Sequence, residues 1–251
     1  MTLVALITDR SNYSRAGLIR SVLSDPSFIF IEFNQGVGGE HTLFKSALRR
    51  AKEIDPEANC LVIKDTSVTS LGSQEVMDAI TSLTSRKFDL AYLASWDDYC
   101  QLQVKLDKKD PMRKVDNVRT QRPSGTQAII FSPNGRDIVL GEAPMANGQT
   151  MGHNEKLDQK LTSEIYNGNI SAVTTIPHIF EYDIALNALT NDDYLKANPC
   201  SPVKMIPTTA KSSSSSNLFW FALIVILVMV VAWAIIKIGP KMKTKAKGKS
   251  K

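Results

Sequence analysis

Charged and polar residues follow four apolar runs of this chain, at the points where each run is expected to leave a buried strand. The segments are Thr8-Asp9-Arg10, the loop GVGGEH at 36–41, Lys64-Asp65-Thr66 and Ser95-Trp96-Asp97-Asp98. In an open parallel sheet, ligands bind beyond the carboxyl ends of the strands, because the loops converge there. Basic and acidic side chains at one such edge could hold a phosphorylated ligand.

No single segment of this edge is a specific motif. Gly36, Gly38 and Gly39 give neither a dinucleotide-binding fingerprint nor a Walker loop, so an ordinary turn is the simpler interpretation. Trp96 could stack a base or a sugar, although packing is the commoner role of such a residue. His41, at the start of an expected helix, is more often a structural histidine than a ligand-binding one.

Alternating apolar runs and amphipathic stretches predict the elements that position these side chains. Strands are expected at 3–8, 28–33, 60–63, 90–93, 126–131 and 170–176, and helices at about 12–23, 42–54, 73–83, 133–140 and 155–166. The charged stretch 103–125 has no clear period and predicts an exposed loop. The alternation predicts an α/β domain over residues 1–182, with a mainly parallel sheet and helices on both of its faces.

A second region, 218–236, consists of nineteen residues without a charge, a glycine or a proline. As a helix it spans about 30 Å, the thickness of the hydrocarbon core of a bilayer. Trp220 and Trp233 lie near its ends, where an indole ring can remain in lipid while its N–H reaches the headgroups. We therefore expect one C-terminal transmembrane helix, connected to the domain by a flexible Pro-, Asn- and Ser-rich tether at 183–217.

The last segment, 237–251, carries seven lysines and no acid. Without these lysines the chain has 23 basic residues against 25 acidic ones, so the domain is nearly neutral and the high pI of about 9.0 comes from the tail. Such a tail suits the anionic headgroups of a membrane surface, and the charge balance gives no reason to expect a nucleic-acid partner.

The orientation in the membrane follows from two opposing signals. The positive-inside tendency places the lysine tail in the cytoplasm and the domain on the other side. The N-terminus lacks a basic segment and a long apolar run, so no secretory signal is expected there, which favours a cytosolic domain. Three scattered cysteines, Cys60, Cys100 and Cys200, fit a reducing compartment. We expect a single-pass protein with a C-terminal anchor and its domain on the cytosolic side.

In order, the segments resemble the glycosyltransferase family 25 group, the lipopolysaccharide and collagen-type sugar transferases. The similarity covers residues 1 to about 182. It lies in the segments LVALITDRSNYSR, GVGGEHTLFKSALRRA, LVIKDTSV, FDLAYLASWDD, GTQAIIFSPNGRDIVL and KLDQKLTSEIYNGNISAVTTIPHIFEYD. The resemblance implies a nucleotide-sugar-binding fold with Arg10 and His41 near the ligand. Lys64 and Trp96 are further candidates for ligand binding because of their own chemistry, not because the family has them. The resemblance also implies Asp158 as the catalytic base, although an acid early in a helix equally complements the helix dipole.

The chain departs from the family at its acidic cluster. The family's Glu-Asp-Asp supplies carboxylates for a divalent cation that stabilises the leaving diphosphate, whereas here Asp65 alone remains, flanked by Lys64 and Thr66. Asp65 could rebuild a Mn²⁺ or Mg²⁺ site together with Asp97 or Asp98. Alternatively, the ammonium of Lys64 could neutralise the phosphate directly. In the third interpretation, which we favour, the domain keeps the scaffold without the chemistry and needs no cofactor.

The sequence thus predicts a membrane-anchored, catalytically degenerate transferase-like protein with a structural or interaction role and a protein partner. Divergent domains of this kind in large DNA viruses with an internal membrane suggest, by analogy, a virion membrane or minor capsid component. Two alternatives stay open: an active membrane-bound glycosyltransferase that uses a nucleotide sugar, and a module that binds a nucleotide or glycan without turnover. Enzymatic activity is thus undecided, with the balance against it.

Overall fold

The computed structural model describes residues 2–8, 13–34, 40–96, 100–106, 116–152 and 156–182. The strands are β1 (Thr2–Thr8), β2 (Phe28–Asn34), β3 (Asn59–Lys64), β4 (Ser67–Val68), β5 (Leu90–Trp96), β6 (Val104–Lys105), β7 (Asp116–Arg119), β8 (Ser124–Phe131), β9 (Ala172–Ile176) and β10 (Glu181–Tyr182). The helices are α1 (Tyr13–Val22), α2 (Glu40–Ile54), α3 (Ser73–Thr84), α4 (Pro133–Leu140) and α5 (Leu157–Tyr166), with a short 3-10 helix at Cys100–Leu102.

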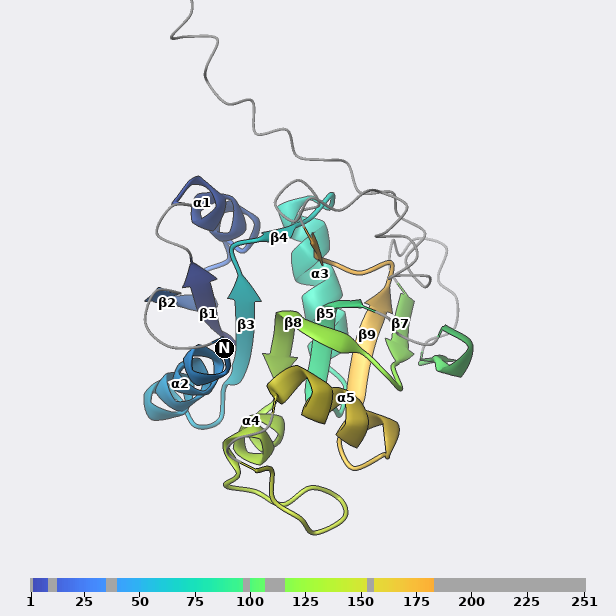
Figure 1. The fold of residues 1–251 in the computed structure, drawn as a ribbon. Coiled ribbons are helices and arrows are strands. Elements are labelled where there is room, and N and C mark those ends of the chain that lie inside the picture. Colours follow the sequence, from blue (N-terminus) through green and yellow to red (C-terminus); the bar gives the residue numbers. More distant parts are fainter. Residues whose placement is uncertain are drawn as a thin grey trace, which may run out of the picture. The chain divides into compact units, whose positions relative to one another are not determined.

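The strands form one large sheet, in the order β2-β1-β3-β8-β5-β9-β7-β6, and a small one of β10 and β4 (Figure 1). In the large sheet β1 pairs with β2 and β3, and β5 with β9, all in parallel. Four other pairings, β3–β8, β5–β8, β7–β9 and β6–β7, are antiparallel. The predicted α/β class is confirmed, but the sheet is mixed rather than mainly parallel.

The direction of β8, which is antiparallel to both of its neighbours, is one reason why the sheet is mixed rather than mainly parallel. Its run TQAIIF is buried on both sides, with Ala128 to Phe131 fully inaccessible, as is usual for a central strand. A continuous apolar run predicts burial, but it has the same pattern whichever way the strand runs. Strand direction depends on the connection that leads into β8, and the residues before it gave no regular pattern.

Two apolar cores cover the two faces of the large sheet. On β1, Leu3, Ala5 and Ile7 belong to the core formed with α2, α4 and α5, whereas Val4 and Leu6 belong to the core formed with α1 and α3. Alternate side chains of a strand point to opposite faces, so β1 contributes to both cores. The prediction of helices on both faces is confirmed.

The start and end of α4 follow the sequence signals directly. Ser132 caps the helix, since its Oγ accepts the N–H of Gly135 at 3.0 Å, and Pro133 occupies the first helical position. Gly141 ends the helix with φ 77°, in the left-handed region that favours glycine. The capping residue predicted for the next helix, Asn154, lies outside the described residues.

The stretch 103–125 is not simply an exposed loop, and that prediction was wrong. It contains β6 and β7, which form an antiparallel pair, and the Lys105 Nζ and the Asp116 Oδ2 form an ion pair of 2.7 Å between them. β7 then pairs with β9. These strands are only two and four residues long, so they are too short to produce a period that the sequence could reveal.

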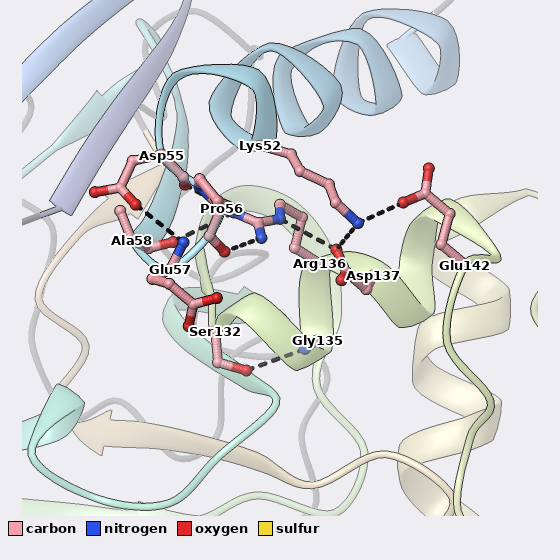
Figure 2. A network of polar contacts seen from close by, with 10 residues as sticks. All are labelled: Lys52, Asp55, Pro56, Glu57, Ala58, Ser132, Gly135, Arg136, Asp137 and Glu142. Atoms are coloured by element: carbon pink, nitrogen blue, oxygen red, sulfur yellow. Dashed lines mark hydrogen bonds and ion pairs between the residues drawn. The ribbon is translucent and has the colours of Figure 1, made fainter.

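A buried arginine connects α4 to the turn that precedes β3 (Figure 2). Arg136 is 1% exposed, and its guanidinium donates to the carbonyl oxygens of Asp55, Pro56 and Ala58. Its Nε also lies 3.3 Å from the Oδ1 of Asp137, which Lys52 contacts at 2.9 Å. The side chain thus supplies a donor to three carbonyl groups of this turn, which indicates a structural role.

The predicted anchor, 218–236, together with the tether and the lysine tail, lies outside the described residues. Among the helices that the structure describes, none combines the length and the apolar character that a membrane span requires. The boundaries at 183, 218 and 237 therefore remain predictions.

Candidate functional site

The end of β3 carries the acid and the lysine on which the sequence analysis depended. Asp65 is 3% exposed, and its backbone N–H donates to the carbonyl oxygen of Ile7 at 3.0 Å. The Nζ of Lys64 donates to the Thr126 Oγ1 at 3.0 Å, so the ammonium reaches toward β8. The side chain of Asp65 is therefore buried at the sheet edge, while that of Lys64 connects two strands.

The predicted base, Asp158, lies in the first turn of α5 and also contacts β8. Its Oδ1 accepts the backbone N–H of Gly125 at 2.5 Å, and its Oδ2 accepts the hydroxyl of Ser124 at 3.3 Å. Gly125 has φ 93°, a conformation that side-chain-bearing residues rarely adopt. The carboxylate of Asp158 therefore fixes the start of β8 against the start of α5.

The pairing of β8 with β5 brings these residues to one edge of the sheet. Ser124, which donates to Asp158, is the register partner of Trp96 at the carboxyl end of β5. Lys64 reaches Thr126, two residues further along β8. The start of β8 is thus the place where the predicted base, the predicted lysine and the backbone of Trp96 come together.

The remaining predicted residues are not placed by the structure. Arg10, Asp97 and Asp98 lie outside the described residues. The backbone of His41 belongs to α2 and that of Trp96 to β5, but the side chains of these two residues also lie outside the described part of the chain. A metal site shared by Asp65 with Asp97 or Asp98 stays a prediction. Within the described ranges, no group of three or more histidine, cysteine or acidic side chains could hold a metal ion.

A hollow of about 550 Å³ opens beside Asp158. Its described walls come from one face of α5 and from the segment that enters β8. The lining residues are Arg122, Ser124, Asp158, Gln159, Thr162, Ser163 and Tyr166. Volumes of this order are typical of small-molecule sites. The sequence analysis selected Asp158 but missed the hollow, because its walls are distant in sequence and meet only where α5 packs against the start of β8.

We expect Asp158→Ala to lower the free energy of unfolding by about 1–2 kcal/mol, because it leaves the Gly125 N–H and the Ser124 hydroxyl without their acceptor. Asp158→Asn retains an acceptor oxygen and should cost less. Urea denaturation of the three proteins measures the difference. Gln159→Ala, on the exposed side of the same turn, is the control and should change stability by less than about 0.5 kcal/mol. Equal stability of Asp158→Ala and the parent would contradict the structural role.

A buried serine–histidine pair lies at the same edge and was not anticipated. The Oγ of Ser95 is 3.1 Å from the Nε2 of His178, and the Oγ1 of Thr174 is 3.3 Å from the Nδ1. The Thr174 hydroxyl donates to the carbonyl oxygen of Tyr92 at 2.8 Å, so it accepts from Nδ1–H and leaves Nε2 to accept from Ser95. Both members of the pair are nearly inaccessible, which indicates that they attach the segment after β9 to β5.

Glu181, on β10, is a buried acid at the far end of that segment. Burial raises the pKa of its carboxyl from 4.5 to about 7. Below pH 4.5 both the folded and the unfolded forms hold the proton. As the pH rises from 4.5 to about 7 the unfolded chain releases the proton first, so stability falls through this range and stays lower above it.

We therefore expect Glu181→Gln to stabilise the protein by about 1–3 kcal/mol at pH 8 relative to its effect at pH 4. The measurement is the free energy of unfolding of both proteins in urea from pH 4 to pH 8. The difference between the two curves isolates Glu181 from the other titrating groups. Parallel pH profiles for the parent and the variant would show that Glu181 is solvated in the folded protein.

These features define an α/β protein with a mixed sheet and a hollow at the start of β8. No family model matches the chain, and no curated protein sequence does. Among solved structures, the protein A197 from STIV is similar at 12% identity over 69% of this chain and 81% of its own, with a TM-score of 0.39. A Bacillus anthracis protein described as a glucose-1-phosphate thymidylyltransferase, solved with sucrose, is similar at 13% identity over 68% and 66%, with a TM-score of 0.35. Likenesses this weak carry no argument about function.

Proposed function

We propose that this is a membrane-anchored protein whose α/β domain serves a structural or interaction role without sugar transfer. The observation that carries the proposal is the hydrogen bonding of the Asp158 carboxylate, both of whose oxygens accept hydrogen bonds from the start of β8. A carboxylate held in this way stabilises the fold, and its lone pairs are partly occupied before any acceptor could bind.

The surroundings of Asp65 support the same proposal. A divalent cation prefers several exposed oxygen ligands that converge on one point. Asp65 is 3% exposed and adjoins Lys64 in the chain, whose positive charge opposes a cation nearby. Such an environment suits a structural acid better than a metal ligand.

The anchoring part of the proposal rests on the sequence of residues 218–251. The apolar stretch has the length of a transmembrane helix, and the seven lysines that follow it would bind anionic headgroups. The domain would then lie on the cytosolic side, where a protein partner could dock. A virion membrane or minor capsid component is the particular form that we propose for this role.

Ligand-dependent stabilisation tests the structural role. The full-length chain is heated with UDP- and dTDP-linked sugars, with and without Mn²⁺. A ligand stabilises only the state that binds it, so the scaffold proposal predicts no shift in the melting temperature under either condition. Metal-dependent stabilisation, or transfer of a sugar that is lost in Asp65→Ala, would overturn it.

An active glycosyltransferase is the second candidate, and the hollow beside Asp158 favours it. A space of about 550 Å³ next to a carboxylate could seat an acceptor against a general base. In that case Asp158→Ala should abolish transfer, whereas the scaffold proposal predicts a change in stability alone.

Membrane attachment is tested separately. The full-length chain should float with lipid vesicles and resist extraction by carbonate, and replacement of the seven tail lysines by glutamine should weaken its preference for anionic over neutral vesicles. Extraction of the protein by carbonate would contradict the transmembrane anchor. Protease added to intact cells should leave the domain uncut if it faces the cytosol.

A further inference from the structure

Strand β2 is an outer strand of the large sheet, and its composition leaves this edge unprotected. Within the described residues β2 pairs with β1 alone (Figure 1). Its sequence, FIFIEFN, has one charge and neither a lysine nor a proline. Outer strands usually carry such residues or are very short, because an exposed row of N–H and C=O groups pairs readily with another strand. The opposite edge follows this rule, since β6 has two residues and one of them is Lys105. The edge formed by β2 is therefore suited to pairing.

The backbone groups of β2 that face away from β1 follow from one hydrogen bond. The N–H of Thr2, the register partner of Phe28, donates to the carbonyl oxygen of Ser27 at 3.3 Å. A strand residue directs its N–H and C=O to one side and the next residue directs them to the other. The odd-numbered residues of β2 thus face β1. The even-numbered ones, with Phe30 and Glu32 at the centre, direct their N–H and C=O groups outward.

The strand is complementary to itself when a second copy runs antiparallel to it. With Ile31 opposite Ile31 of the second copy, the two strands overlap over their whole length, and Phe30 lies opposite Glu32. Both of these residues direct their backbone groups outward, so each such pair can exchange both of its hydrogen bonds. A shift by one residue would oppose outward-facing groups to groups that already face β1. A register with Glu32 opposite Glu32 would bring like charges together.

Apolar side chains fit this register on the face of β2 that α2 covers. Phe33 packs against the core on this face, and Ile29 and Ile31 point to the same side. Ile29 is 40% exposed, so α2 leaves part of this row in contact with water. In the self-paired arrangement Ile31 lies opposite its own copy, and Ile29 lies opposite Phe33. The pairing therefore buries the exposed apolar surface of one copy against that of the other.

The charges fit on the other face, which α1 covers. The guanidinium of Arg20 lies 5.3 Å from the centre of the Phe30 ring and forms an ion pair with Glu32. Both side chains of this ion pair are nearly half exposed, at 46% and 42%. In the self-paired arrangement Glu32 of the second copy lies opposite Phe30, so each Arg20 has one carboxylate from its own chain and one from the second copy nearby. Positive and negative charges then alternate across the interface, which favours the pair.

We infer that β2 pairs antiparallel with β2 of a second copy of this chain, centred on Ile31, so that the two large sheets become one continuous sheet. A strand pair buries less surface than the roughly 1,200–2,000 Å² of a standard interface, so we expect a dissociation constant of about 10–100 μM in solution. A membrane that confined both copies would raise their effective concentration. The inference goes beyond the proposed role, and it holds equally for an active transferase.

Cysteine cross-linking of the full-length chain tests the register. The variant Ile31→Cys is made together with Cys100→Ser and Cys200→Ser, while Cys60, which is fully buried, is retained. Residues opposite each other in a non-hydrogen-bonded pair have Cα atoms about 4.5 Å apart, within the range of a disulfide. We expect oxidation with copper phenanthroline in detergent solution to convert most of this variant to a disulfide-linked dimer.

Ile29→Cys in the same background is the matched control. Ile29 is more exposed than Ile31, so random collisions would cross-link it faster. In the inferred pair the two copies of residue 29 are about 14 Å apart along the strands, too far for a disulfide. Mixed with Phe33→Cys, which provides its opposite residue, Ile29→Cys should cross-link. The inference is overturned if Ile31→Cys stays monomeric, or if Ile29→Cys alone cross-links as fast as Ile31→Cys.

Glu32→Pro tests the backbone pairing in the otherwise native chain. Proline removes an N–H that faces outward, so the pairing with β1 is retained while the pairing with a second copy loses a donor. In sedimentation equilibrium of the full-length chain in density-matched detergent, Glu32→Pro should weaken the dimer about tenfold or more. Glu32→Ala keeps the N–H and should weaken it less, and thermal unfolding verifies that both variants are folded. A monomeric parent at about 300 μM, or equal association of the parent and Glu32→Pro, would overturn the inference.

Discussion

Gly135→Ala is expected to lower the free energy of unfolding by about 3 kcal/mol or more. A Cβ atom built at Gly135 would lie 2.0 Å from the carbonyl oxygen of Asp89 and 2.6 Å from its carbonyl carbon. Both atoms belong to the backbone, so no side-chain rotation can relieve the overlap. Either α4 must move away from the residue before β5, or the strand itself must shift.

Neither movement is easy, because Asp89 is held close to α4 by several hydrogen bonds. Its carbonyl oxygen accepts the N–H of Ser132 at 3.0 Å, and its carboxylate accepts from Asn134 and from the N–H of Ser171, each at 2.8 Å. Relieving the overlap at Gly135 would break some of these bonds. The expected loss of stability is large because the hydrogen bonds of Asp89 hold the start of α4 close to the start of β5.

Gly17→Ala is the matched control for Gly135→Ala. Gly17 lies inside α1, and an added Cβ meets no atom within 4 Å. Because alanine has the higher helix propensity, this substitution should stabilise the protein by about 0.5–1 kcal/mol. Urea denaturation of both variants measures the two changes in the free energy of unfolding, which should have opposite signs. A loss of less than about 1 kcal/mol for Gly135→Ala would mean that α4 and Asp89 are not in the close contact described here.

The positions of the helices and long strands could be predicted from the sequence, because each carries its own signal. The run 90–93 and the capped segment beginning at Ser132 both appear as elements close to the expected residues. The direction of β8 and the strands β6 and β7 could not be predicted. Pairing between strands is decided by residues far apart in the chain, and no local period records it.

At the candidate site, too, the residue types could be predicted from the sequence, whereas their contacts could not. The sequence selected Lys64 and Asp158 by residue type and by resemblance, but it gave no sign that both contact β8 within three residues of each other. It also gave no sign of Tyr166, whose exposed ring matters only beside a hollow that the fold creates. A contact between Ser95 and His178, 83 residues apart, depends on the order of strands in the sheet in the same way.

Arg136→Met is expected to cost about 3–5 kcal/mol, the second large effect. Methionine has a similar length and fits the buried space, so the loss would come from polar groups rather than from volume. The carbonyl oxygens of Asp55, Pro56 and Ala58 all accept from this guanidinium (Figure 2). Without it, these oxygens in the turn before β3 lose a buried donor that water replaces poorly.

Arg136→Lys separates the charge from the geometry. A lysine keeps the positive charge near Asp137, but its ammonium is a single point and cannot reach three carbonyl groups as the planar guanidinium does. We expect it to recover less than half of the loss. If Arg136→Lys were as stable as the parent, the ion pair with Asp137 would be the important contact and the turn would need no bridging donor.

Arg50→Met is the matched control for this arginine. Arg50 lies on α2 with a side chain that is 57% exposed, and it pairs with Glu53 at 2.9 Å. An exposed ion pair contributes little, so this substitution should change the free energy of unfolding by less than about 0.5 kcal/mol. The same chemical change at the two arginines then differs in burial and in partners, which are three backbone carbonyl groups at Arg136 and one exposed carboxylate at Arg50. The contrast, measured in urea at one pH, assigns the cost of Arg136→Met to the carbonyl groups that lose the guanidinium as a donor.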